Sequence, residues 1–371
     1  MYQCPFFFGL DLQMKELLSV VIPTYNEKDN ITPLITAVHQ ALDGISHEII
    51  IVDDSSDDGT IDIVKKLTVK FPVKIFVRRD ERGLATAVIH GIKQASGNVI
   101  AVMDADLQHP PEILPQLFKA IQGGADMAIA SRYIKGGGCP NWGLIRRLTS
   151  KGALMVAHIF LPSSRRVKDP MSGYFMFRPE KVDLLKLKPV GYKIALEIMI
   201  VGAFTKIVEV PFMFKERSAG RSKLKIQTQV EYLSHILSLM SRTGEFWRFV
   251  KFIAVGATGT GVNEGVLALV ITFTNWHGVI QLIPGIEVSI ITNFLLNDFF
   301  TFADRRSGKI GSFFWRLLKY NVFAGAGAFI NWGVAALLFN NAGVDIYIAN
   351  IIGIVVAFLW NYFFSTIWAW K

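Results

Sequence analysis

The sequence has only two cysteines, Cys4 and Cys139, and they lie far apart. Two such residues cannot form the disulfide framework that stabilises small secreted domains. Neither has a Cys or His partner at the spacing of a zinc site. His109 stands alone against two prolines, where we expect a turn residue rather than a metal ligand. We therefore expect no disulfide-stapled fold and no zinc centre, and we expect the thiols to face a reducing, cytoplasmic environment.

Charged residues are also scarce, and they are unevenly distributed. Only 19% of the 371 residues are charged, 51% are hydrophobic, and the mean hydropathy of +0.37 is too high for a wholly soluble enzyme. Charges are frequent before about residue 225, whereas long apolar runs dominate from Phe246 onward. This pattern predicts a soluble α/β domain followed by an all-α membrane domain.

Basic residues are missing from the start of the chain. The apolar stretch Tyr2–Leu10 is short and lacks the charged region that begins a secretory signal peptide. We interpret residues 1–15 as a leader of unknown role, upstream of an alternative start at Met14.

The charge that is present is mainly positive. A formal net charge of +9 suits a protein that rests on an anionic membrane surface and handles phosphorylated ligands. Nucleic acid is a poorer explanation, because no platform of interleaved basic and aromatic residues accompanies the charge.

The most informative motif is a pair of carboxylates that follows a short apolar run. Residues 98–102 predict a buried strand, and Asp104 and Asp106 follow its end. Two carboxylates one residue apart at the end of a strand can share a divalent cation, and a cation there can hold a diphosphate. Taken alone, the pair also fits a solvated turn or a helix cap.

Two earlier strands also end in polar turns. One breaks at Pro23, just before Tyr25 and Glu27. The next runs into Asp53 and Asp54. Because helical patterns separate the strands, we expect a parallel sheet whose carboxyl-end turns meet at one edge, where ligands bind. On local grounds the same residues also fit turns and helix caps.

These motifs belong to a longer ordered set. The set comprises Pro23 to Glu27, Val52-Asp53-Asp54, Asp104 to Glu112, Ser131-Arg132-Tyr133, Asp169 to Phe175 and Phe214 to Leu224. Over residues 16–225 the chain resembles the family 2 glycosyltransferases of the GT-A fold, which have a Rossmann-like α/β architecture with a mostly parallel sheet. Within that family, Gln108-His109-Pro110-Pro111 and the segment from Asp169 to Phe175 are similar to those of enzymes that transfer mannose to a dolichyl phosphate.

The resemblance implies a donor site for GDP-mannose. The residues that it assigns to this site are Pro23, Tyr25, Glu27, Val52, Asp54, Asp104, Ala105, Asp106, Arg132, Arg217 and Lys223. Those that it assigns to catalysis are Asp104, Asp106, Arg132 and Arg217. Arg217 and Lys223 flank a loop that would close over the donor diphosphate. The alternative is a plain charged surface loop.

The acidic pair also predicts a metal site from its chemistry. Asp104, Asp106 and the carboxamide oxygen of Gln108 would share the cation with diphosphate oxygens and water. Such a set suits Mg²⁺ or Mn²⁺, which prefer oxygen ligands. We therefore expect a divalent cation, Mg or Mn, as the cofactor.

The chemistry of a phosphate acceptor directs attention to arginines. A phosphate monoester carries a charge of about −1.5 to −2 at neutral pH, so transfer to it needs little base catalysis. The enzyme must instead neutralise two anions and hold them in line. Arg132 follows a buried strand, while Arg146 and Ser150 lie one helical turn apart on an amphipathic segment from Leu144 to Phe160. We interpret the three as the acceptor-phosphate site; alternatively, the basic residues of the segment only contact lipid headgroups.

Four apolar segments are long enough to cross a membrane. They are about 249–273, 279–302, 316–340 and 346–369, in a predicted transmembrane domain at 246–371 that follows interfacial amphipathic helices at 226–245. Lys and Arg precede the first span and occupy the link between the second and third, whereas the other two links contain none. By the positive-inside rule, both termini, the central link and the enzyme domain face the cytoplasm.

The spans form two repeated hairpins. Gly261–Leu269 in the first span is similar to Phe329–Leu337 in the third, and Asn297–Phe302 ending the second is similar to Asn361–Thr366 in the fourth. Two hairpins of the same orientation imply a parallel repeat. The region resembles the GtrA-like four-helix membrane domain.

Three acidic residues lie in apolar helical segments. We interpret Glu197 as a packed structural acid rather than a general base, because a phosphate acceptor needs no deprotonation. Glu264 and Asp298 lie in predicted spans, where an acid is costly, so each is a candidate functional residue. The alternative for both is hydrogen bonding between helices.

Together these observations favour a membrane-anchored, metal-dependent, inverting glycosyltransferase. By resemblance, it moves mannose from GDP-mannose to a dolichyl (polyprenyl) phosphate on the cytoplasmic face of the membrane, giving a β-linked mannosyl-phosphoryl lipid and GDP. Two alternatives stay open. One is a UDP-glucose-dependent polyprenyl-phosphate glucosyltransferase, and the other is a lipid-linked-sugar flippase with a regulatory soluble domain.

Overall fold

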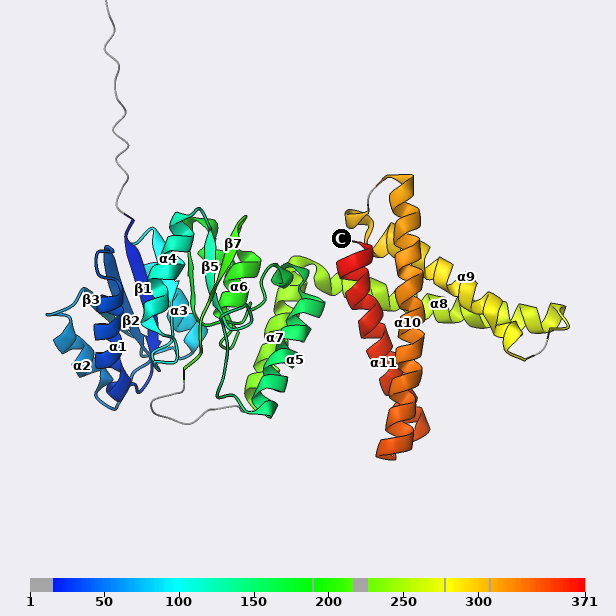
Figure 1. The fold of residues 1–371 in the computed structure, drawn as a ribbon, viewed down its shortest axis with the longest axis horizontal. Coiled ribbons are helices and arrows are strands. Elements are labelled where there is room, and N and C mark those ends of the chain that lie inside the picture. Colours follow the sequence, from blue (N-terminus) through cyan, green and yellow to red (C-terminus); the bar gives the residue numbers. More distant parts are fainter. Residues whose placement is uncertain (1–15, 189, 216–225, 277, 307, 371) are drawn as a thin grey trace, which may run out of the picture. The chain divides into compact units, whose positions relative to one another are not determined.

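The structure is a computed structural model that describes residues 16–188, 190–215, 226–276, 278–306 and 308–370 (Figure 1). The predicted leader at 1–15 lies outside these residues, as do Arg217 and Lys223. The chain divides into two compact units. The first comprises the residues up to Leu154 together with Ser163–His235, and the second comprises Met155–Pro162 and Ile236–Lys371.

The chain changes unit at three points. The sequence predicted a single boundary at residue 225, whereas the described chain passes to the second unit after Leu154, returns after Pro162 and passes again after His235. The first and last of these points fall within continuous α-helices. The predicted interfacial segment at 226–245 contains one helix, α7 (Ile226–Thr243). Its location at a membrane surface stays a prediction.

The first unit contains a seven-stranded sheet in the order β3-β2-β1-β4-β6-β5-β7. Its strands are β1 (Leu18–Thr24), β2 (His47–Asp53), β3 (Val73–Val77), β4 (Val99–Val102), β5 (Met127–Ser131), β6 (Phe175–Phe177) and β7 (Ile207–Pro211). The helices before α7 are α1 (Lys28–Ala41), α2 (Thr60–Leu67), α3 (Leu84–Gln94), α4 (Leu114–Gln122), α5 (Leu144–Phe160) and α6 (Ile194–Val201), with 3-10 helices at Pro111–Ile113, Pro162–Arg166, Pro179–Lys181 and Leu184–Lys186. β6 runs antiparallel to both neighbours and the other pairs are parallel, so the predicted mostly parallel α/β sheet is confirmed.

The central strands are apolar along their length because helices cover both faces of the sheet. Val20 and Ile22 belong to one buried cluster with residues of α1 and α4. Val21, between them, points to the other face, where a Cβ on Gly91 of α3 would clash with it. The alternation of side chains along β1 thus sends successive residues into two different cores.

The parallel pairing brings several strand ends to one edge. Pro23 of β1 lies beside Val52 of β2, and Val21 lies beside Val102 at the end of β4. The turns that leave these strands therefore start close together. They carry the donor-site motifs predicted from the sequence.

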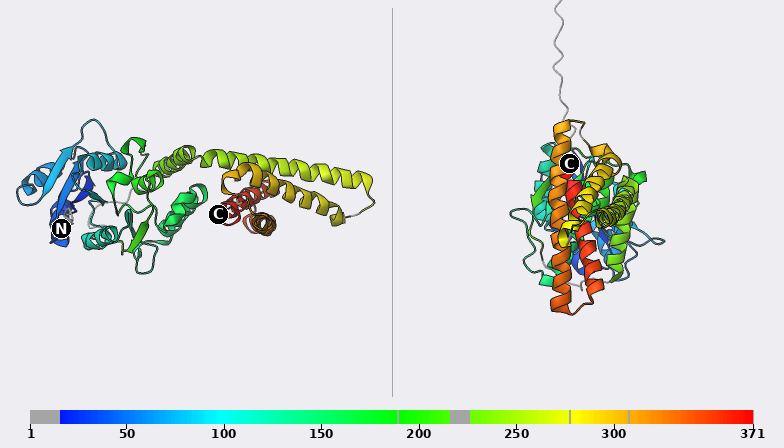
Figure 2. Two further views of the ribbon diagram at one scale, coloured as in Figure 1. Left: turned by 90° about the horizontal axis from the view of Figure 1, so that it is seen from above. Right: turned by 90° about the vertical axis from the view of Figure 1, so that its right-hand side faces the viewer.

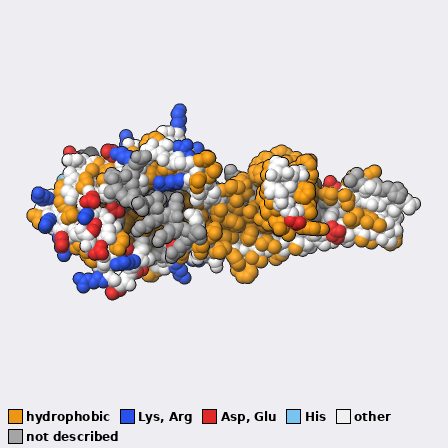
Figure 3. All heavy atoms as spheres, turned by 90° about the horizontal axis from the view of Figure 1, so that it is seen from below, with side chains coloured by type: hydrophobic (Ala, Val, Ile, Leu, Met, Phe, Trp, Pro, Cys, Tyr) orange, Lys and Arg blue, Asp and Glu red, His pale blue; other side chains and the backbone are white. Residues whose placement is uncertain are grey.

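The second unit consists of long apolar helices. They are α8 (Glu245–Phe273), α9 (Leu282–Leu296), α10 (Ile310–Ala342) and α11 (Ile346–Phe364), with 3-10 helices at Gly278–Gln281 and Ala303–Arg305 and π-helices at Asn297–Thr301 and Ser365–Ala369. Among the described residues, four helical stretches are long and apolar enough to cross a membrane, which confirms the four predicted spans. In Figure 3, hydrophobic side chains form a large continuous area on this unit, whereas Lys, Arg, Asp and Glu are spread over the first unit.

The four helices form two hairpins, α8 with α9 and α10 with α11 (Figures 1 and 2). In each hairpin, two Asn side chains lie against Gly residues that have no room for a Cβ: Asn263 against Gly285, Asn293 against Gly259, Asn331 against Gly353, and Asn361 against Gly327. The same number of residues separates Asn263 from Asn331 and Asn293 from Asn361, and also the glycine that each contacts from its counterpart in the other hairpin. This interval equates Asn361 with Asn293, one helical turn before Asn297, so the correspondence between the second and fourth spans taken from the sequence was wrong by one turn.

The two hairpins meet at an aromatic cluster. Its ring pairs are reciprocal in the repeat: Phe302 with Trp370, Phe252 with Tyr362, and Phe294 with Tyr320, with ring centroids 4.6, 5.2 and 5.9 Å apart. Reciprocal contacts between equivalent positions indicate an approximate two-fold relation between the hairpins.

Candidate functional site

The turn after β1 places the first predicted donor residues. Tyr25 is 43% exposed, and the guanidinium of Arg82 lies 5.2 Å from the centre of its ring. Asn26 has a positive φ of 58°, and Glu27 occupies the N-cap position of α1, where its carboxylate accepts a hydrogen bond from Asn30. Glu27 therefore stands at a helix cap, whereas Tyr25 presents an aromatic face at the sheet edge on which a base could stack.

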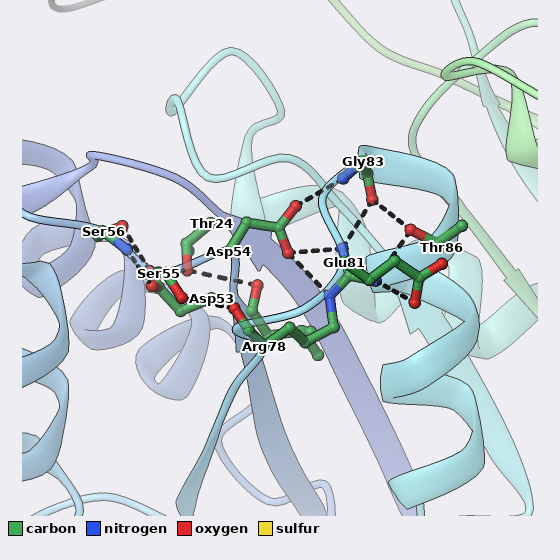
Figure 4. Close-up of polar contacts among 10 residues, drawn as sticks. Thr24, Asp53, Asp54, Ser55, Ser56, Arg78, Glu81, Gly83 and Thr86 are labelled. Carbon is green, nitrogen blue, oxygen red and sulfur yellow. Dashed lines mark hydrogen bonds and ion pairs between the residues drawn. The ribbon is translucent and has the colours of Figure 1, made fainter.

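Asp54 is held in a buried network with Arg78 (Figure 4). Nε and Nη2 of Arg78 donate to Asp54 Oδ1 at 2.8 and 2.5 Å, and the backbone N–H of Gly83 donates to Oδ2 at 2.8 Å. Arg78 also donates to the Gly83 carbonyl and to Thr86. The sequence did not identify Arg78, because no local pattern links it to Asp54. Oδ2 keeps capacity for one further donor, such as a ribose hydroxyl.

Two predicted donor residues are buried. The side chain of Val52 is fully buried and lies against Gly91 of α3, so it supports the sheet rather than lining a pocket. Ala105, between the two carboxylates, is 4% exposed. These residues can influence a donor only through the position of the backbone around them.

The turn after β4 brings the predicted metal ligands together. Leu107 has a positive φ of 61°, and after this bend the backbone N–H of Gln108 donates to Asp106 Oδ1 at 3.2 Å. The side-chain nitrogen of Gln108 donates to the Lys215 carbonyl at 3.2 Å. This bond fixes the donor half of the amide, so Oε1 is the atom that a cation would bind.

His109, which the sequence suggested to be a turn residue, is a buried part of this acidic centre. Its ring stacks on Tyr174, with centroids 5.0 Å apart. Its Nδ1 accepts the backbone N–H of Asp104 at 3.0 Å, and its Nε2 lies 3.7 Å from Asp104 Oδ2. Burial lowers the pKa of the imidazole, although Asp104 and Asp106 oppose the shift. The ring is therefore neutral at pH 7, with its proton on Nε2 facing the carboxylate.

The acidic centre fits a hard cation that also binds substrate phosphate. In the part of the chain that the structure describes, no cluster of three or more His, Cys, Asp or Glu side chains could hold a metal. Asp104 and Asp106 thus provide two carboxylates only. Gly173 leaves space beside them, since a Cβ there would lie 3.2 Å from Asp104 Oδ2. Magnesium sites commonly use one or two carboxylates and complete their shell with substrate phosphate and water, so these residues, with Gln108, fit the predicted Mg²⁺ or Mn²⁺.

Arg132, which follows β5, is bound to a buried acid. Its Nε and Nη2 donate to the two carboxylate oxygens of Asp169 at 2.8 Å each, and Asp169 is fully buried. Burial opposes the charge of Arg132, but the pair with Asp169 raises its pKa, so the guanidinium stays charged. Nη1 enters no hydrogen bond to a described residue. It is the nitrogen through which Arg132 can bind a phosphate.

Helix α5 carries the other predicted acceptor residues. The guanidinium of Arg146 lies 4.3 Å from the centre of the Trp142 ring. Ser150, one turn further along, shares a hydrogen bond of 2.8 Å with the hydroxyl of Tyr133. The structure therefore ties the start of α5 to the segment that follows Arg132.

A cavity of about 310 Å³ adjoins Arg132. It is lined by Arg132, Tyr133, Gly138, Cys139, Pro140, Trp142, Arg147, Lys151 and Met213. Arg147 Nη2 donates to the carbonyls of Cys139 and Pro140, which holds this side chain at the wall. Trp142, Arg147 and Lys151 were missed from the sequence, because nothing distinguishes them from other surface residues until the fold places them beside Arg132.

One aromatic ring lies between the acidic and basic centres. The ring of Phe214 is 5.9 Å from that of His109 and 5.5 Å from that of Trp142. The guanidinium groups of Arg132 and Arg146 each lie 5.8 Å from its centre. The predicted metal site and the predicted acceptor site are therefore neighbours across a single side chain.

Lys193 is a further cation that the sequence did not reveal. It stands at the N-cap position of α6, and its ammonium donates to the Met171 carbonyl at 3.3 Å. Burial and the charge of Arg132 lower its pKa to about 8, while Asp169 and Asp104 act in the opposite direction. The fold thus brings a lysine with a perturbed pKa toward Arg132, Asp169 and Asp104.

Glu197 is enclosed by protein. It is fully buried, its Oε2 lies 2.7 Å from Nε2 of His235, and its Oε1 accepts the backbone N–H of Lys188 at 2.8 Å. These contacts support the interpretation of Glu197 as a structural acid. Arg217 and Lys223, assigned to the donor diphosphate by resemblance, lie outside the described residues.

Two known families match successive parts of the chain. The family described as Glycosyl transferase family 2 matches residues 19–183, and the family described as GtrA/DPMS, transmembrane domain, matches residues 251–370. The chain is 49% identical over 344 residues to the dolichol-phosphate mannosyltransferase of Pyrococcus furiosus, covering 92% of this chain and 96% of that protein. It is 37% identical over 234 residues to the dolichol-phosphate mannosyltransferase of Saccharomyces cerevisiae, covering 60% of this chain and 86% of that protein. A solved structure of glucosyl-3-phosphoglycerate synthase from Mycobacterium tuberculosis, in complex with Mn²⁺, UDP-glucose and phosphoglyceric acid, aligns with a TM-score of 0.48 at 19% identity over 61% of this chain and 80% of that one.

Proposed function

Because this chain belongs to the dolichol-phosphate mannosyltransferase family, we propose that it transfers mannose from GDP-mannose to a dolichyl (polyprenyl) phosphate at the cytoplasmic face of a membrane. Family membership makes the protein an integral membrane glycosyltransferase. The observation that carries the finer proposal is the adjacency of an acidic turn, Asp104 to Gln108, and a basic cavity beside Arg132, joined by Phe214.

The donor nucleotide is proposed to bind along the edge formed by β1, β2 and β4. Tyr25 offers a face for the base, and Oδ2 of Asp54 offers an acceptor for a ribose hydroxyl. Arg78 holds Asp54 in place. The diphosphate then extends toward Asp104 and Asp106, which lie after the neighbouring strand.

The diphosphate carries charge that the two carboxylates alone would repel. A divalent cation held by Asp104, Asp106 and Gln108 would supply the compensating charge and stabilise the departing diphosphate. His109 orients Asp104 by accepting a hydrogen bond from the backbone N–H of Asp104, and it directs its own Nε2–H toward the Asp104 carboxylate. We propose that Arg217 and Lys223 add further positive charge from their loop.

The acceptor phosphate is proposed to bind in the basic cavity. Arg132, Arg147 and Lys151 line this cavity, and Nη1 of Arg132 contacts the phosphate oxygens. Arg146 and Ser150 are not among the lining residues; they contact the phosphate from beside Trp142 and Tyr133, which are. One phosphate oxygen bonds to the anomeric carbon of mannose while the bond from that carbon to the diphosphate breaks, and GDP leaves. A single displacement of this kind inverts the anomeric configuration and gives a β-linked product.

No general base is needed for this displacement. The attacking oxygen is already ionised, so the protein has to hold two anions close together rather than remove a proton. The enclosure of Glu197 by His235 and Lys188 is consistent with this chemistry, since it keeps that carboxylate away from a basic role. The distribution of Lys and Arg between the spans supports a cytoplasmic catalytic domain.

The proposal is tested by comparing two donors. The full chain in detergent is supplied with one polyprenyl phosphate and with either GDP-mannose or UDP-glucose, and kcat/KM is measured for each. We expect GDP-mannose to be the preferred donor. A preference for UDP-glucose would assign the glucosyltransferase alternative. If neither donor is consumed while labelled lipid-linked sugar crosses a bilayer containing the protein, the flippase alternative is correct.

A further inference from the structure

The helical unit contains a cavity that the proposed transfer reaction does not use. Its volume is about 470 Å³, and it lies where the segment after α9 meets the start of α10. It is lined by Asp298, Phe299, Ala303, Arg306, Gly308, Lys309, Ile310, Phe313, Phe314 and Arg316. The lining thus combines three basic side chains with aromatic and aliphatic ones. Arg316 lies within a span, where a charge is costly and usually serves a function, whereas Arg306 and Lys309 belong to the link that precedes this span.

A buried ion pair belongs to the wall of this cavity. Asp298 is 1% exposed and accepts hydrogen bonds from Nε and Nη2 of Arg316 at 2.8 and 3.2 Å. It also accepts the indole N–H of Trp370 at 2.8 Å. The formal charges of the lining sum to a net positive value, because three basic side chains accompany the single carboxylate of Asp298.

The repeat shows that the hairpin fold does not itself require this pair. In the second hairpin, Thr366 occupies the position equivalent to Asp298. In the first hairpin, Arg248 is equivalent to Arg316, and it pairs with Glu245 instead. A buried ion pair stabilises a fold little more than hydrophobic packing would. The Asp298–Arg316 pair is therefore better explained by binding than by folding.

An apolar surface continues from the cavity to the outside of the unit. Phe299, Ile310 and Phe314 line the cavity and are 58, 77 and 62% exposed. The guanidinium of Arg306 lies 4.7 Å from the centre of the Phe299 ring. A cationic group at the end of an exposed apolar surface is the arrangement expected at the boundary between lipid chains and headgroups.

We propose that this cavity binds the phosphate group of a membrane lipid. Arg306 and Lys309 contact the phosphate, and the lipid chain lies over Ile310 and Phe314. Basic pockets between membrane helices bind anionic headgroups, and an arginine-to-phosphate contact is a strong, charge-assisted hydrogen bond. This site is separate from the donor and acceptor sites proposed above and does not depend on them.

The test measures lipid binding to the full chain in detergent by native mass spectrometry. Phosphatidic acid and a polyprenyl phosphate are titrated separately. Diacylglycerol and polyprenol are the corresponding lipids without phosphate, and inorganic phosphate is the probe without a lipid chain. We expect saturable binding of phosphatidic acid to the wild type. Binding should weaken about 30-fold in Arg306→Gln/Lys309→Gln, since each cation near an anionic lipid contributes roughly a factor of five. Polyprenyl phosphate should occupy both the acceptor site and this cavity, and Arg306→Gln/Lys309→Gln should lose only the binding in this cavity.

The matched control removes the same two charges elsewhere. Lys251→Gln/Lys319→Gln changes two lysines of the spans that do not line the cavity, and it should bind phosphatidic acid within about twofold of the wild type. Unchanged GDP-mannose affinity in both variants verifies that the protein is folded. Equal losses in the two double variants would overturn the proposed location. Competition by inorganic phosphate at the same concentration as lipid would show an anion site and overturn the proposal of a lipid.

Discussion

At the scale of single residues, the charged groups of the catalytic unit are held by buried partners. Arg132 is fixed by Asp169 and Arg78 by Asp54, in both cases through Nε and Nη2. Such pairs add little net stability, but loss of one partner leaves a buried charge and is strongly destabilising. Their benefit is orientation, because a guanidinium that is held on one side presents its remaining nitrogen in a defined direction.

Arg146 tests the placement of the acceptor. It lies against Trp142, and it shares the ring of Phe214 with Arg132. Arg146→Ala should raise the KM for polyprenyl phosphate or lower turnover by about 10- to 100-fold, the effect of losing one charge-assisted contact of about 1.5–3 kcal/mol. Calorimetry should show donor affinity close to that of the wild type.

Arg146→Lys provides the conservative control for this prediction. Lysine keeps the charge but lacks the planar fork, so it should restore only part of the activity. If Arg146→Ala instead weakened GDP-mannose binding and left the dependence on lipid phosphate unchanged, Arg146 would belong to the donor site.

Lys193 predicts a decline of activity at alkaline pH. Its pKa is lowered from 10.5 to about 8, so its ammonium loses a proton as the pH rises through about 8. If the ammonium helps to hold the substrate phosphates, kcat/KM should fall above that pH, because this ratio reports the free enzyme. Lys193→Arg should remove the decline, since an arginine stays protonated. A decline that persists unchanged in this variant would exclude Lys193 as its source.

The same shift has a consequence for stability. Because folding lowers this pKa, the folded state binds fewer protons than the unfolded state between pH 8 and 10.5. The cost of burying the charged lysine is fully present below about pH 8 and decreases as the pH rises through this window.

At the scale of elements, residue patterns predicted the strands and helices well but missed the contacts between them. Apolar runs ending in polar turns gave the parallel sheet, and long apolar segments gave the four spans. Arg78 and Lys193 were missed because their partners are distant in sequence and no local motif marks them. His109 does lie in a bend, as its neighbouring prolines indicated, but its burial against Tyr174 and its contact with Asp104 were missed.

The hairpins of the second unit depend on close contacts that a sequence pattern does not display. Similar residues after Asn297 and Asn361 suggested that these two positions are equivalent in the repeat. The Asn-to-Gly contacts instead make Asn293, one helical turn earlier, the equivalent of Asn361. A glycine that admits a neighbouring asparagine fixes the register of two helices more strictly than apolar packing does.

Gly285 provides a test of that register. A Cβ there would lie 2.7 Å from Oδ1 and 2.8 Å from the carbonyl oxygen of Asn263. Gly285→Ala should therefore destabilise the protein by about 1–3 kcal/mol through overpacking, seen as a lower melting temperature in detergent. Gly265→Ala is the control in the partner helix, since a Cβ there meets nothing within 4 Å. Equal melting temperatures for the two variants would contradict the contact.

At the scale of the whole molecule, the chain joins an α/β unit to a unit of membrane-spanning helices through helices that take part in both. This organisation suits an enzyme whose donor is dissolved in water and whose acceptor is a lipid. The family similarity extends over both units, as the identity over 92% of the chain indicates. The central claim is that two carboxylates and a cation act on the donor diphosphate while arginines hold the acceptor phosphate.

The most direct test of this claim is mannosyl transfer from GDP-mannose to polyprenyl phosphate by the full chain, measured with Mg²⁺ or Mn²⁺ and again in EDTA. We expect chelation to abolish turnover and excess cation to restore it. Asp104→Asn and Asp106→Asn should each lower turnover by at least about 100-fold, even with saturating metal, while melting temperatures verify that the variants are folded. Undiminished turnover in EDTA, or full activity in either variant, would contradict the account.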